Sequence, residues 1–187
     1  FLAAPAMFHV AGIAPLVAMA WLGATSVSLP SFDAERCLDA IERERVTMWS
    51  SVPTMLHRVV HHADVPNYDL SSLVAVSFGA APISRETLAR AREVLPVKEN
   101  FTNAYGLTET SSTIALLGPQ DHRDAFASHD ETARKRLVSV GQPLPTVEVK
   151  VCDVETGRPL GPGEHGLIHV RGEQVSGEYK EKSALTA

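Results

Sequence analysis

Residue types that could hold a nucleotide occur together in the segment NAYGLTET at residues 103–110. Tyr105 offers a flat ring on which a base could stack, and the flanking Gly106 favours an open turn. Thr108 offers a hydroxyl group to a phosphate oxygen, and Glu109 offers a hard carboxylate of the kind that binds Mg²⁺. The segment therefore indicates a crevice for a base and its metal-bound phosphate.

A second candidate segment, FGAAPIS at residues 78–84, also follows an apolar run. Gly79, Ala80 and Ala81 carry almost no side chain, so a planar ligand could lie against their backbone. Both segments follow runs that predict strands, and ligands bind beyond the carboxyl ends of the strands in an open parallel sheet. We therefore expect the two segments to border one ligand site.

The elements that must position these segments are short runs rich in Val, Ser and Thr. They recur about every 25 residues, at 25–29, 48–52, 74–78 and 99–104, and helical patterns separate them. Strands and helices that alternate in this way predict parallel strands joined by right-handed crossovers. The predicted fold class is α/β, a parallel-sheet three-layer subdomain with crossover helices.

The predicted helices have their own start signals. Asp33 and Ser84 are candidate caps, and Pro53 occupies a suitable first helical position. The residues that we expect on their buried faces are Ala34, Cys37, Leu38, Ile41, Met55, Leu56, Val59, Val60, Leu88, Ala91 and Leu95. The first thirty residues carry no charged side chain apart from His9, and we expect a buried helix that leads into a buried strand there.

The pattern changes after the first hundred residues. Residues 119–137 are polar and charged and predict a surface loop or a short helix. Alternating apolar residues then predict strands at 146–154 and 167–172. We therefore predict two parts, an α/β subdomain over residues 1–137 and an incomplete, small β-barrel subdomain over residues 138–187.

Composition narrows the classes of function. The chain has 187 residues, of which 44% are hydrophobic and 21% charged, and these are values of a globular protein. The net charge of −5 disfavours nucleic acid or an anionic membrane as the main partner. The only cysteines, Cys37 and Cys152, are far apart, which favours a reducing compartment and hence a cytoplasmic location.

Four segments resemble one family. NAYGLTET is similar to the Tyr-Gly-x-Thr-Glu motif of the adenylate-forming superfamily, which includes acyl- and aryl-CoA synthetases, luciferases and peptide-synthetase adenylation domains. AMFHVAG at residues 6–12 resembles the Phe-His-x-x-Gly stretch of acyl- and aryl-CoA ligases, and SFGAAPIS resembles their adenine-side Gly-Ala-x-Pro loop. The chain from GQPLP at residues 141–145 onward follows the family's course into its β-barrel subdomain.

The resemblance implies part of an ATP-dependent acyl- or aryl-CoA synthetase. Such an enzyme activates a hydrophobic carboxylic acid as acyl-AMP, then transfers the acyl group to CoA. The implied ligands are ATP or AMP, Mg²⁺, the acid, and CoA as co-substrate, with no nucleic acid and no transmembrane segment. An adenylation domain that loads a carrier protein and a non-catalytic nucleotide-binding or interaction module remain as alternatives.

The resemblance also implies roles for individual residues. Catalysis would involve Thr108, Glu109 and His9, with Glu109 as the ligand of Mg²⁺. His9, Gly79, Ala80 and Ala104 would line the acyl pocket. The nucleotide would contact Gly79, Ala80, Ala81, Pro82, Asn103, Ala104, Tyr105, Gly106, Leu107 and Thr108. Without the resemblance, His9 could be a core histidine and Glu109 an ordinary helix-start carboxylate.

Several features of the family have no counterpart in this sequence. These are the phosphate loop that ends in Pro-Lys-Gly, the ribose-binding Thr-Gly-Asp and the C-terminal domain with its catalytic lysine. Glu178 stands where the family has a glycine before its tyrosine. We therefore expect an internal piece of the N-terminal domain that does not catalyse the reaction by itself and can self-associate through exposed apolar surface.

Overall fold

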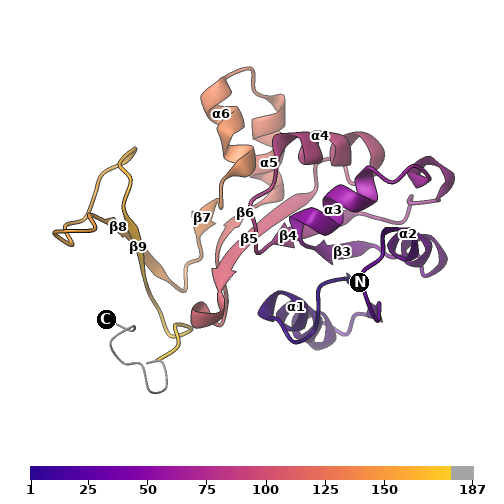
Figure 1. The fold of residues 1–187 in the computed structure, drawn as a ribbon, viewed down its shortest axis with the longest axis horizontal. Coiled ribbons are helices and arrows are strands. Elements are labelled where there is room, and N and C mark those ends of the chain that lie inside the picture. The colour runs from indigo at the N-terminus through magenta and orange to yellow at the C-terminus, as the bar shows by residue number, and fades with distance from the viewer. Residues whose placement is uncertain (178–187) are drawn as a thin grey trace.

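A computed structural model describes residues 1–177, so the departure at Glu178 lies outside the described residues. A seven-stranded sheet in the order β2-β1-β3-β4-β5-β6-β7 forms its centre, and a separate antiparallel pair, β8 and β9, lies beyond one edge (Figure 1). The strands are β1 (Leu2–Ala3), β2 (Val27–Ser28), β3 (Met48–Ser51), β4 (Ala75–Gly79), β5 (Phe101–Leu107), β6 (Ser112–Leu117), β7 (Gln142–Pro143), β8 (Glu148–Cys152) and β9 (Leu167–Arg171).

Helices cover both faces of the sheet. They are α1 (Val10–Trp21), α2 (Ala34–Arg43), α3 (Pro53–Val60), α4 (Arg85–Val94), α5 (Pro119–Ala127) and α6 (Glu131–Lys135), with 3₁₀ helices η1 (Val65–Asn67), η2 (Thr108–Thr110) and η3 (Arg136–Val138). The chain moves from β1 to β2 in one direction and then back past β1 to β3. Right-handed crossovers therefore place α1 on the face opposite to α2, α3 and α4, as Figure 1 shows.

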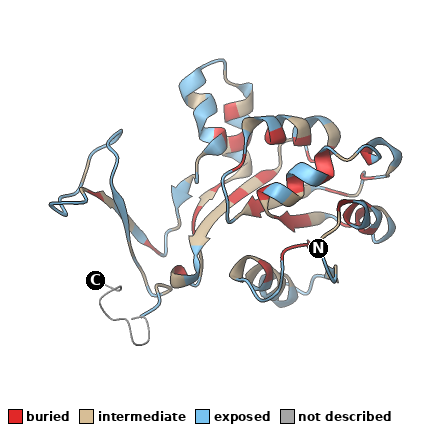
Figure 2. Cartoon of the chain, viewed as in Figure 1, coloured by how far each residue is buried: buried red, intermediate tan, exposed pale blue. Residues whose placement is uncertain are grey.

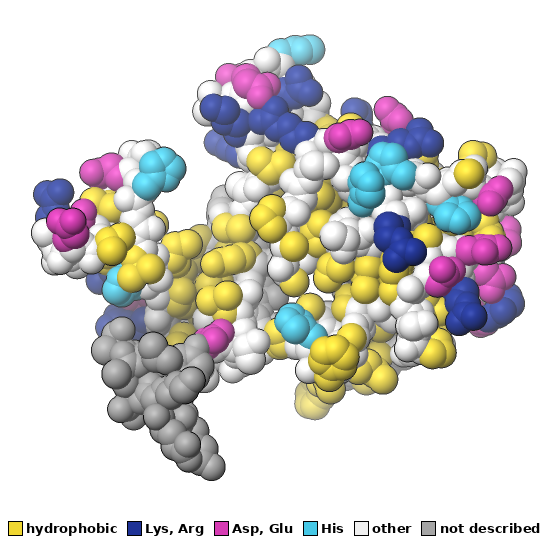
Figure 3. Space-filling view, viewed as in Figure 1, with side chains coloured by type: hydrophobic (Ala, Val, Ile, Leu, Met, Phe, Trp, Pro, Cys, Tyr) yellow, Lys and Arg dark blue, Asp and Glu magenta, His cyan; other side chains and the backbone are white. Residues whose placement is uncertain are grey.

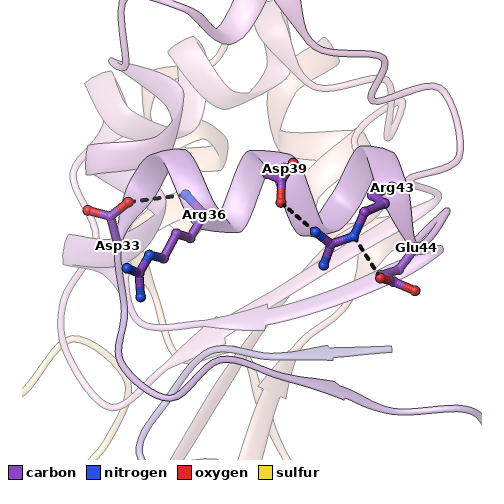
Figure 4. A network of polar contacts seen from close by, with 5 residues as sticks. All are labelled: Asp33, Arg36, Asp39, Arg43 and Glu44. Carbon is purple, nitrogen blue, oxygen red and sulfur yellow. Dashed lines mark hydrogen bonds and ion pairs between the residues drawn. The ribbon is translucent and has the colours of Figure 1, made fainter.

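Helix α2 illustrates how local sequence fixes the packed layer. The Asp33 carboxylate accepts a hydrogen bond from the Arg36 amide at 3.1 Å, which caps the helix as predicted (Figure 4). Its apolar face is fully buried, whereas its outer face carries exposed ion pairs from Arg43 to Asp39 and Glu44, at 3.2 and 2.9 Å. Exposed pairs of this kind add little stability, so the buried face determines how α2 docks.

The next two helices also confirm their start signals. Helix α3 begins at Pro53, and the Ser84 hydroxyl at the start of α4 accepts a hydrogen bond from the Thr87 amide at 3.1 Å. Of the eleven side chains predicted to face inward, all except the half-buried Met55 are buried. The amphipathic patterns were therefore sufficient to predict this layer.

The two faces of the sheet differ in side-chain size. Trp49, Val76 and Phe101 are in register on β3, β4 and β5, and all three are buried in the core that the helices of the α2–α4 layer complete. One residue further along, Ser50 and Ser77 are paired in the same register on the α1 face. Because side chains alternate along a strand, one face is bulky and apolar and the other is small.

The prediction of a buried N-terminal helix was wrong. Gly12 is the only buried residue of α1, while Val17 and Trp21 are 60 and 90% exposed. Hydrophobic side chains gather over this helix in the space-filling view, and Figure 2 shows how little of it is buried compared with α2 and α3. The reason is topological, because no other described element covers the outer side of α1. Self-association through this surface stays a prediction.

The sheet is also not wholly parallel. Strands β2, β3, β4 and β5 are parallel as predicted, and β1, which the sequence patterns had not indicated, is parallel as well. Strands β6 and β7 add two antiparallel partners that the patterns had not indicated either. Residues 119–137, predicted as a loop or a short helix, form α5, α6 and most of η3. Strand β7 joins the large sheet. The predicted division of the chain at residue 137 and the predicted β-barrel subdomain both remain predictions.

Both cysteines, Cys37 and Cys152, are buried free thiols. Within residues 1–177, no helix is both long enough and apolar enough to span a bilayer.

Candidate functional site

A cavity of about 110 Å³ lies at the carboxyl ends of β3 and β4, beside the start of α1. The order of the strands reverses at this point, because α1 leaves β1 on one face and the later crossovers run on the other. Such switch points are where open α/β sheets bind ligands. The lining residues are His9, Val10, Ala11, Pro15, Ser50, Ser51, Ser77, Phe78, Gly79, Ala80, Ala104, Gly106, Ser112 and Thr113.

His9 caps the helix that forms one wall of this cavity. Its Nδ1 atom accepts a hydrogen bond from the Ala11 amide at 3.1 Å. A neutral His9 must therefore carry its proton on Nε2, which leaves that atom as a donor for a ligand. Gly12 lets the preceding loop fold against α1, because a Cβ atom at this position would collide with the carbonyl oxygen of Ala6. The spacing Phe-His-x-x-Gly is thus explained by two contacts: the histidine caps α1, and the glycine lets the preceding loop approach the helix.

Gly79 and Ala80 form the floor of the cavity at the end of β4. A side chain at Gly79 would collide with the carbonyl oxygen of Ala104, so only glycine allows β4 and β5 to approach in this way. Ala80 has a φ angle of +67°, in the left-handed region that costs about 1–2 kcal/mol for a residue with a Cβ atom. Ala81 and Pro82 follow it on the surface and do not line the cavity.

The NAYGL part of the motif is strand rather than the turn beyond a strand, which corrects the sequence prediction. Strand β5 continues to Leu107 because β6 folds back and pairs with it. A bulge interrupts this pairing between Tyr105 and Gly106, and a Cβ atom at Gly106 would collide with the carbonyl oxygen of Ser112. Ala104 and Gly106 consequently line the cavity, whereas the half-buried Tyr105 does not.

Asn103 does not meet the cavity either. It is buried on the side of the sheet that holds Phe78, its register partner, and its amide nitrogen donates to the carbonyl oxygen of Ser139 at 2.9 Å. The side chain therefore ties β5 to the segment that follows η3. Its predicted contact with the nucleotide stays a prediction.

Thr108 and Glu109 lie on the tight turn η2 that joins β5 to β6. Thr108 is exposed and Glu109 is half-buried, so both can be reached from the same edge of the sheet as the cavity. Thr110, which sequence reasoning missed, holds this turn from within: its buried hydroxyl accepts from the Leu107 amide at 3.0 Å and lies 2.9 Å from the Ser112 carbonyl oxygen. The tendency of threonine to bond to its own backbone in turns was the available signal.

Three serines of the cavity wall were also missed. Ser50 and Ser51 end β3, and Ser77 lies in the middle of β4. The Ser51 hydroxyl donates to the Ser77 carbonyl oxygen at 3.3 Å. Their signal was the presence of small polar residues inside otherwise apolar strands. Together with the alanines and glycines, they leave space on the α1 face and offer hydroxyl groups at its border.

Two buried side chains of the packed layer, Cys37 and His122, have altered acidity. Burial raises the pKa of the Cys37 thiol to about 12, and Asp33 adds to the effect, so this cysteine is not a nucleophile at neutral pH. Burial lowers the pKa of His122, although the carbonyl groups of Gly118 and Phe101 and the charge of Asp121 oppose the change. These groups serve the core.

Comparison with known proteins adds an independent finding. The family model described as "AMP-binding enzyme" matches residues 1–180. A 4-coumarate–CoA ligase-like protein of Oryza sativa subsp. japonica is 33% identical over 97% of this chain, which covers 28% of that protein. The medium/long-chain fatty-acid–CoA ligase FadD8 of Mycobacterium tuberculosis is 37% identical over 84% of this chain and 25% of its own length.

A solved structure matches over a longer part of the chain. The o-succinylbenzoate CoA synthetase of Bacillus subtilis, in complex with ATP and a magnesium ion, aligns with a TM-score of 0.78 and 30% identity. The match covers 99% of this chain and 35% of that one. The chain therefore spans between about a quarter and a third of the length of the proteins that it matches.

Proposed function

This chain belongs to the family of AMP-binding enzymes, and from this we propose that the protein containing it is an acyl- or aryl-CoA synthetase acting on a hydrophobic acid. The observation that carries the proposal is the cavity at the switch point of the sheet, bordered by His9, Gly79, Ala80 and Ala104, on the same edge as Thr108 and Glu109. Ligases for CoA among the relatives support the reaction class.

The proposed reaction has two steps. A carboxylate oxygen of the acid attacks the α-phosphorus of ATP, so that a new oxygen–phosphorus bond forms and pyrophosphate leaves with the electron pair of the broken bond. The thiol of CoA then attacks the acyl carbon, loses its proton and displaces AMP. Each step exchanges one acyl or phosphoryl acceptor for another, and neither requires an oxidant or a reductant.

The residues divide into two groups in this proposal. His9 would donate from Nε2 to the acid's carboxylate and hold it at the mouth of the cavity, while the small side chains of Ala80 and Ala104 leave room for the acyl group. Tyr105 would stack on the adenine ring, and Thr108 would donate to a phosphate oxygen. The exposure of Thr108 and the half-buried position of Tyr105 leave both groups accessible from this edge.

The donor set on the turn fits magnesium. Residues 1–177 contain no cluster of three or more His, Cys, Asp or Glu side chains suited to a metal, so a metal held by protein side chains alone is not supported there. Mg²⁺ needs fewer, because it is usually held by one or two carboxylates together with substrate phosphates and water. Glu109 would hold the ion jointly with the phosphates, whose negative charge the ion neutralises.

The acid that we propose is a hydrophobic aliphatic or aryl acid. The cavity wall beside His9 consists of Val10, Ala11 and Pro15 on α1, and the rest of the lining is alanine, glycine and serine together with Phe78 and Thr113. This lining offers contact area to carbon and hydrogen and provides no cation for a second carboxylate of the substrate. Relatives named for coumarate-type and fatty acids agree with this class.

The substitution Glu109→Gln in the full-length protein tests the function. We expect the magnesium-dependent exchange of pyrophosphate into ATP to fall at least a hundredfold, because the carboxylate is replaced by a neutral amide of the same size. Glu155→Gln, an exposed glutamate in the turn after β8, is the matched control and should leave the exchange unchanged. A non-catalytic module would bind nucleotide equally well with either variant and show no exchange in the parent protein.

The acid and the acceptor are tested separately. Exchange measured with acetate, octanoate, palmitate and 4-coumarate should favour the larger acids, and a preference for acetate would refute the proposed substrate class. Product analysis with CoA and with a phosphopantetheinyl carrier protein then distinguishes a CoA ligase from a carrier-loading domain. We also expect a purified polypeptide of these 187 residues to form no acyl-CoA, and detection of that product would refute this part of the proposal.

A further inference from the structure

The chain returns from the β8–β9 pair to the candidate site through Gln174. The Gln174 side-chain nitrogen donates to two carbonyl oxygens of the site, that of Thr110 at 3.0 Å and that of Thr113 at 2.9 Å. Its side-chain oxygen accepts a hydrogen bond from the Thr146 hydroxyl at 3.2 Å, just before β8. Both N–H groups and the oxygen of this half-buried amide are therefore used, and one side chain joins two separate parts of the molecule.

The two carbonyl groups flank the turn that carries Thr108 and Glu109. Thr110 ends η2, and Thr113 lies on β6 opposite Gly106, beside the bulge of β5. Two residues after Gln174, the Ser176 amide donates to the Glu109 carbonyl oxygen at 2.6 Å. The segment 174–176 thus holds the backbone of the turn from outside, as the Thr110 hydroxyl holds it from inside.

We propose that Gln174 is a positioning residue that fixes the turn of Thr108 and Glu109 relative to the β8–β9 pair. The inference rests on the proposed function, because the turn is where the phosphates and their magnesium ion would bind. Gln174 itself would touch neither the substrate nor the ion. It acts on the backbone, and the two carbonyl groups that it binds can be satisfied by water when it is lost, so the fold should survive its replacement.

The first test is hydrogen exchange in the full-length protein, compared with Gln174→Ala. We expect the backbone amides of residues 107–113 to exchange about tenfold faster in the variant, while exchange in the α2–α4 layer stays unchanged. Gln120→Ala is the matched control, because Gln120 also makes side-chain hydrogen bonds, but on the exposed surface of α5. Unchanged exchange over residues 107–113, or faster exchange throughout the protein, would overturn the proposal.

The second test separates positioning from a merely structural role. We expect Gln174→Ala to raise the KM for ATP about tenfold and to leave the KM for the acid within about twofold, since Gln174 does not line the cavity and contacts its wall only at the backbone carbonyl of Thr113. Gln174→Glu should increase the amide exchange of residues 107–113 and the KM for ATP more than Gln174→Ala does, because a carboxylate facing two carbonyl oxygens has no proton to donate. An equal rise in both KM values would overturn the proposal.

The outcome of the first test does not depend on the proposed function. If the parent protein neither binds MgATP nor exchanges pyrophosphate, the proposed function is wrong. Hydrogen exchange over residues 107–113 still decides in that case whether Gln174 fixes the turn. If the parent protein is active and Gln174→Ala behaves like the parent in both measurements, the function stands and the role of Gln174 is refuted.

Discussion

The two faces of the central sheet serve different purposes, although the same strands form both. On one face, Trp49, Val76 and Phe101 pack under the helices of the α2–α4 layer and are fully buried. On the other face, Ser77, Gly79 and their neighbours leave a cavity under α1. A single strand such as β4 therefore supplies a core residue and a site residue in alternation.

This difference teaches how an α/β sheet can combine stability with a ligand site. Bulky side chains on one face provide enough buried apolar surface to fix the strands. The other face can then carry residues as small as glycine without unfolding the sheet. The missing side chain creates space and allows β4 and β5 to approach closely. We expect substitutions on the two faces to affect different properties, and the following predictions test this from the largest effect to the smallest.

Phe101→Ala should have the largest effect on stability. Phe101 is fully buried in the packed layer at the start of β5, and removing its ring leaves a cavity that the surrounding helices cannot fill. We expect the free energy of unfolding, measured by urea denaturation, to fall by about 3–5 kcal/mol.

Phe8→Ala is the matched control for this comparison, because Phe8 is 95% exposed beside α1. It should change the free energy of unfolding by no more than about 0.5 kcal/mol. Equal losses from the two substitutions would contradict the contrast between the faces, and would indicate that Phe8 is covered in the protein that was measured.

Gly106→Ala should have the next largest effect, and it should act on binding as well as on stability. The added methyl group collides with the carbonyl oxygen of Ser112 and forces β5 and β6 apart at the bulge. We expect a loss of about 1–3 kcal/mol in the free energy of unfolding, together with weaker binding of ATP in calorimetry. Gly161→Ala, in the exposed turn between β8 and β9, should change neither; binding unaffected by Gly106→Ala would refute the role of the bulge.

Asp33→Ala tests the contribution of a cap in the packed layer. The variant loses the hydrogen bond to the Arg36 amide, and we expect the free energy of unfolding to fall by about 1 kcal/mol. Asp130→Ala removes a similar cap from α6, which has no buried residues, and should cost less. If both substitutions cost the same in thermal or urea denaturation, burial of the capped helix does not determine the effect.

The smallest effect that we expect is a dependence of stability on pH through His122. Burial lowers the pKa of this side chain below its ordinary value near 6.5, so the unfolded chain takes up a proton before the folded protein does. The contribution of the neutral His122 to the free energy of unfolding is fully present above about pH 6.5 and declines as the pH falls below this value. Between pH 7.5 and 6, the loss should not exceed about 1 kcal/mol, because one pH unit per proton corresponds to about 1.4 kcal/mol.

His122→Asn provides the comparison for this pH effect. The His122 Nδ1 atom donates to the Gly118 carbonyl oxygen at 2.9 Å, and an asparagine amide can make the same bond without titrating. Urea denaturation at the two pH values should therefore show a flatter dependence for the variant. A parent protein that gains stability on acidification, with the variant unchanged, would contradict the sign of this prediction.

Local signals were sufficient wherever one element determines its own structure. The caps at Asp33 and Ser84, the proline at position 53 and the apolar stripes of α2, α3 and α4 were all predicted from spacing alone. The strands β2, β3, β4 and β5 were found for the same reason. The resemblance of NAYGLTET to a family motif pointed to the correct family before any contact was known.

Features that depend on a distant partner were not predicted. Strand β5 extends to Leu107 only because β6 folds back beside it, and the sequence of β6 carries no strong alternation. Pairing with Phe78 buries Asn103 on the packed face, and the hydrogen bond from its amide to the carbonyl oxygen of Ser139, 36 residues further along, was not predicted. Gln174 is 61 residues from Thr113, so nothing in its neighbourhood indicates the contact.

The sequence by itself therefore determined helices α2, α3 and α4, the parallel centre of the sheet and the family, because capping, periodicity and short motifs are properties of neighbouring residues. The tertiary structure alone decided which face each strand residue occupies, which residues border the cavity, and how segment 174–176 holds the turn of Thr108 and Glu109. These depend on strand register and on the direction of the crossovers, and both are fixed only when segments far apart in the chain pack together.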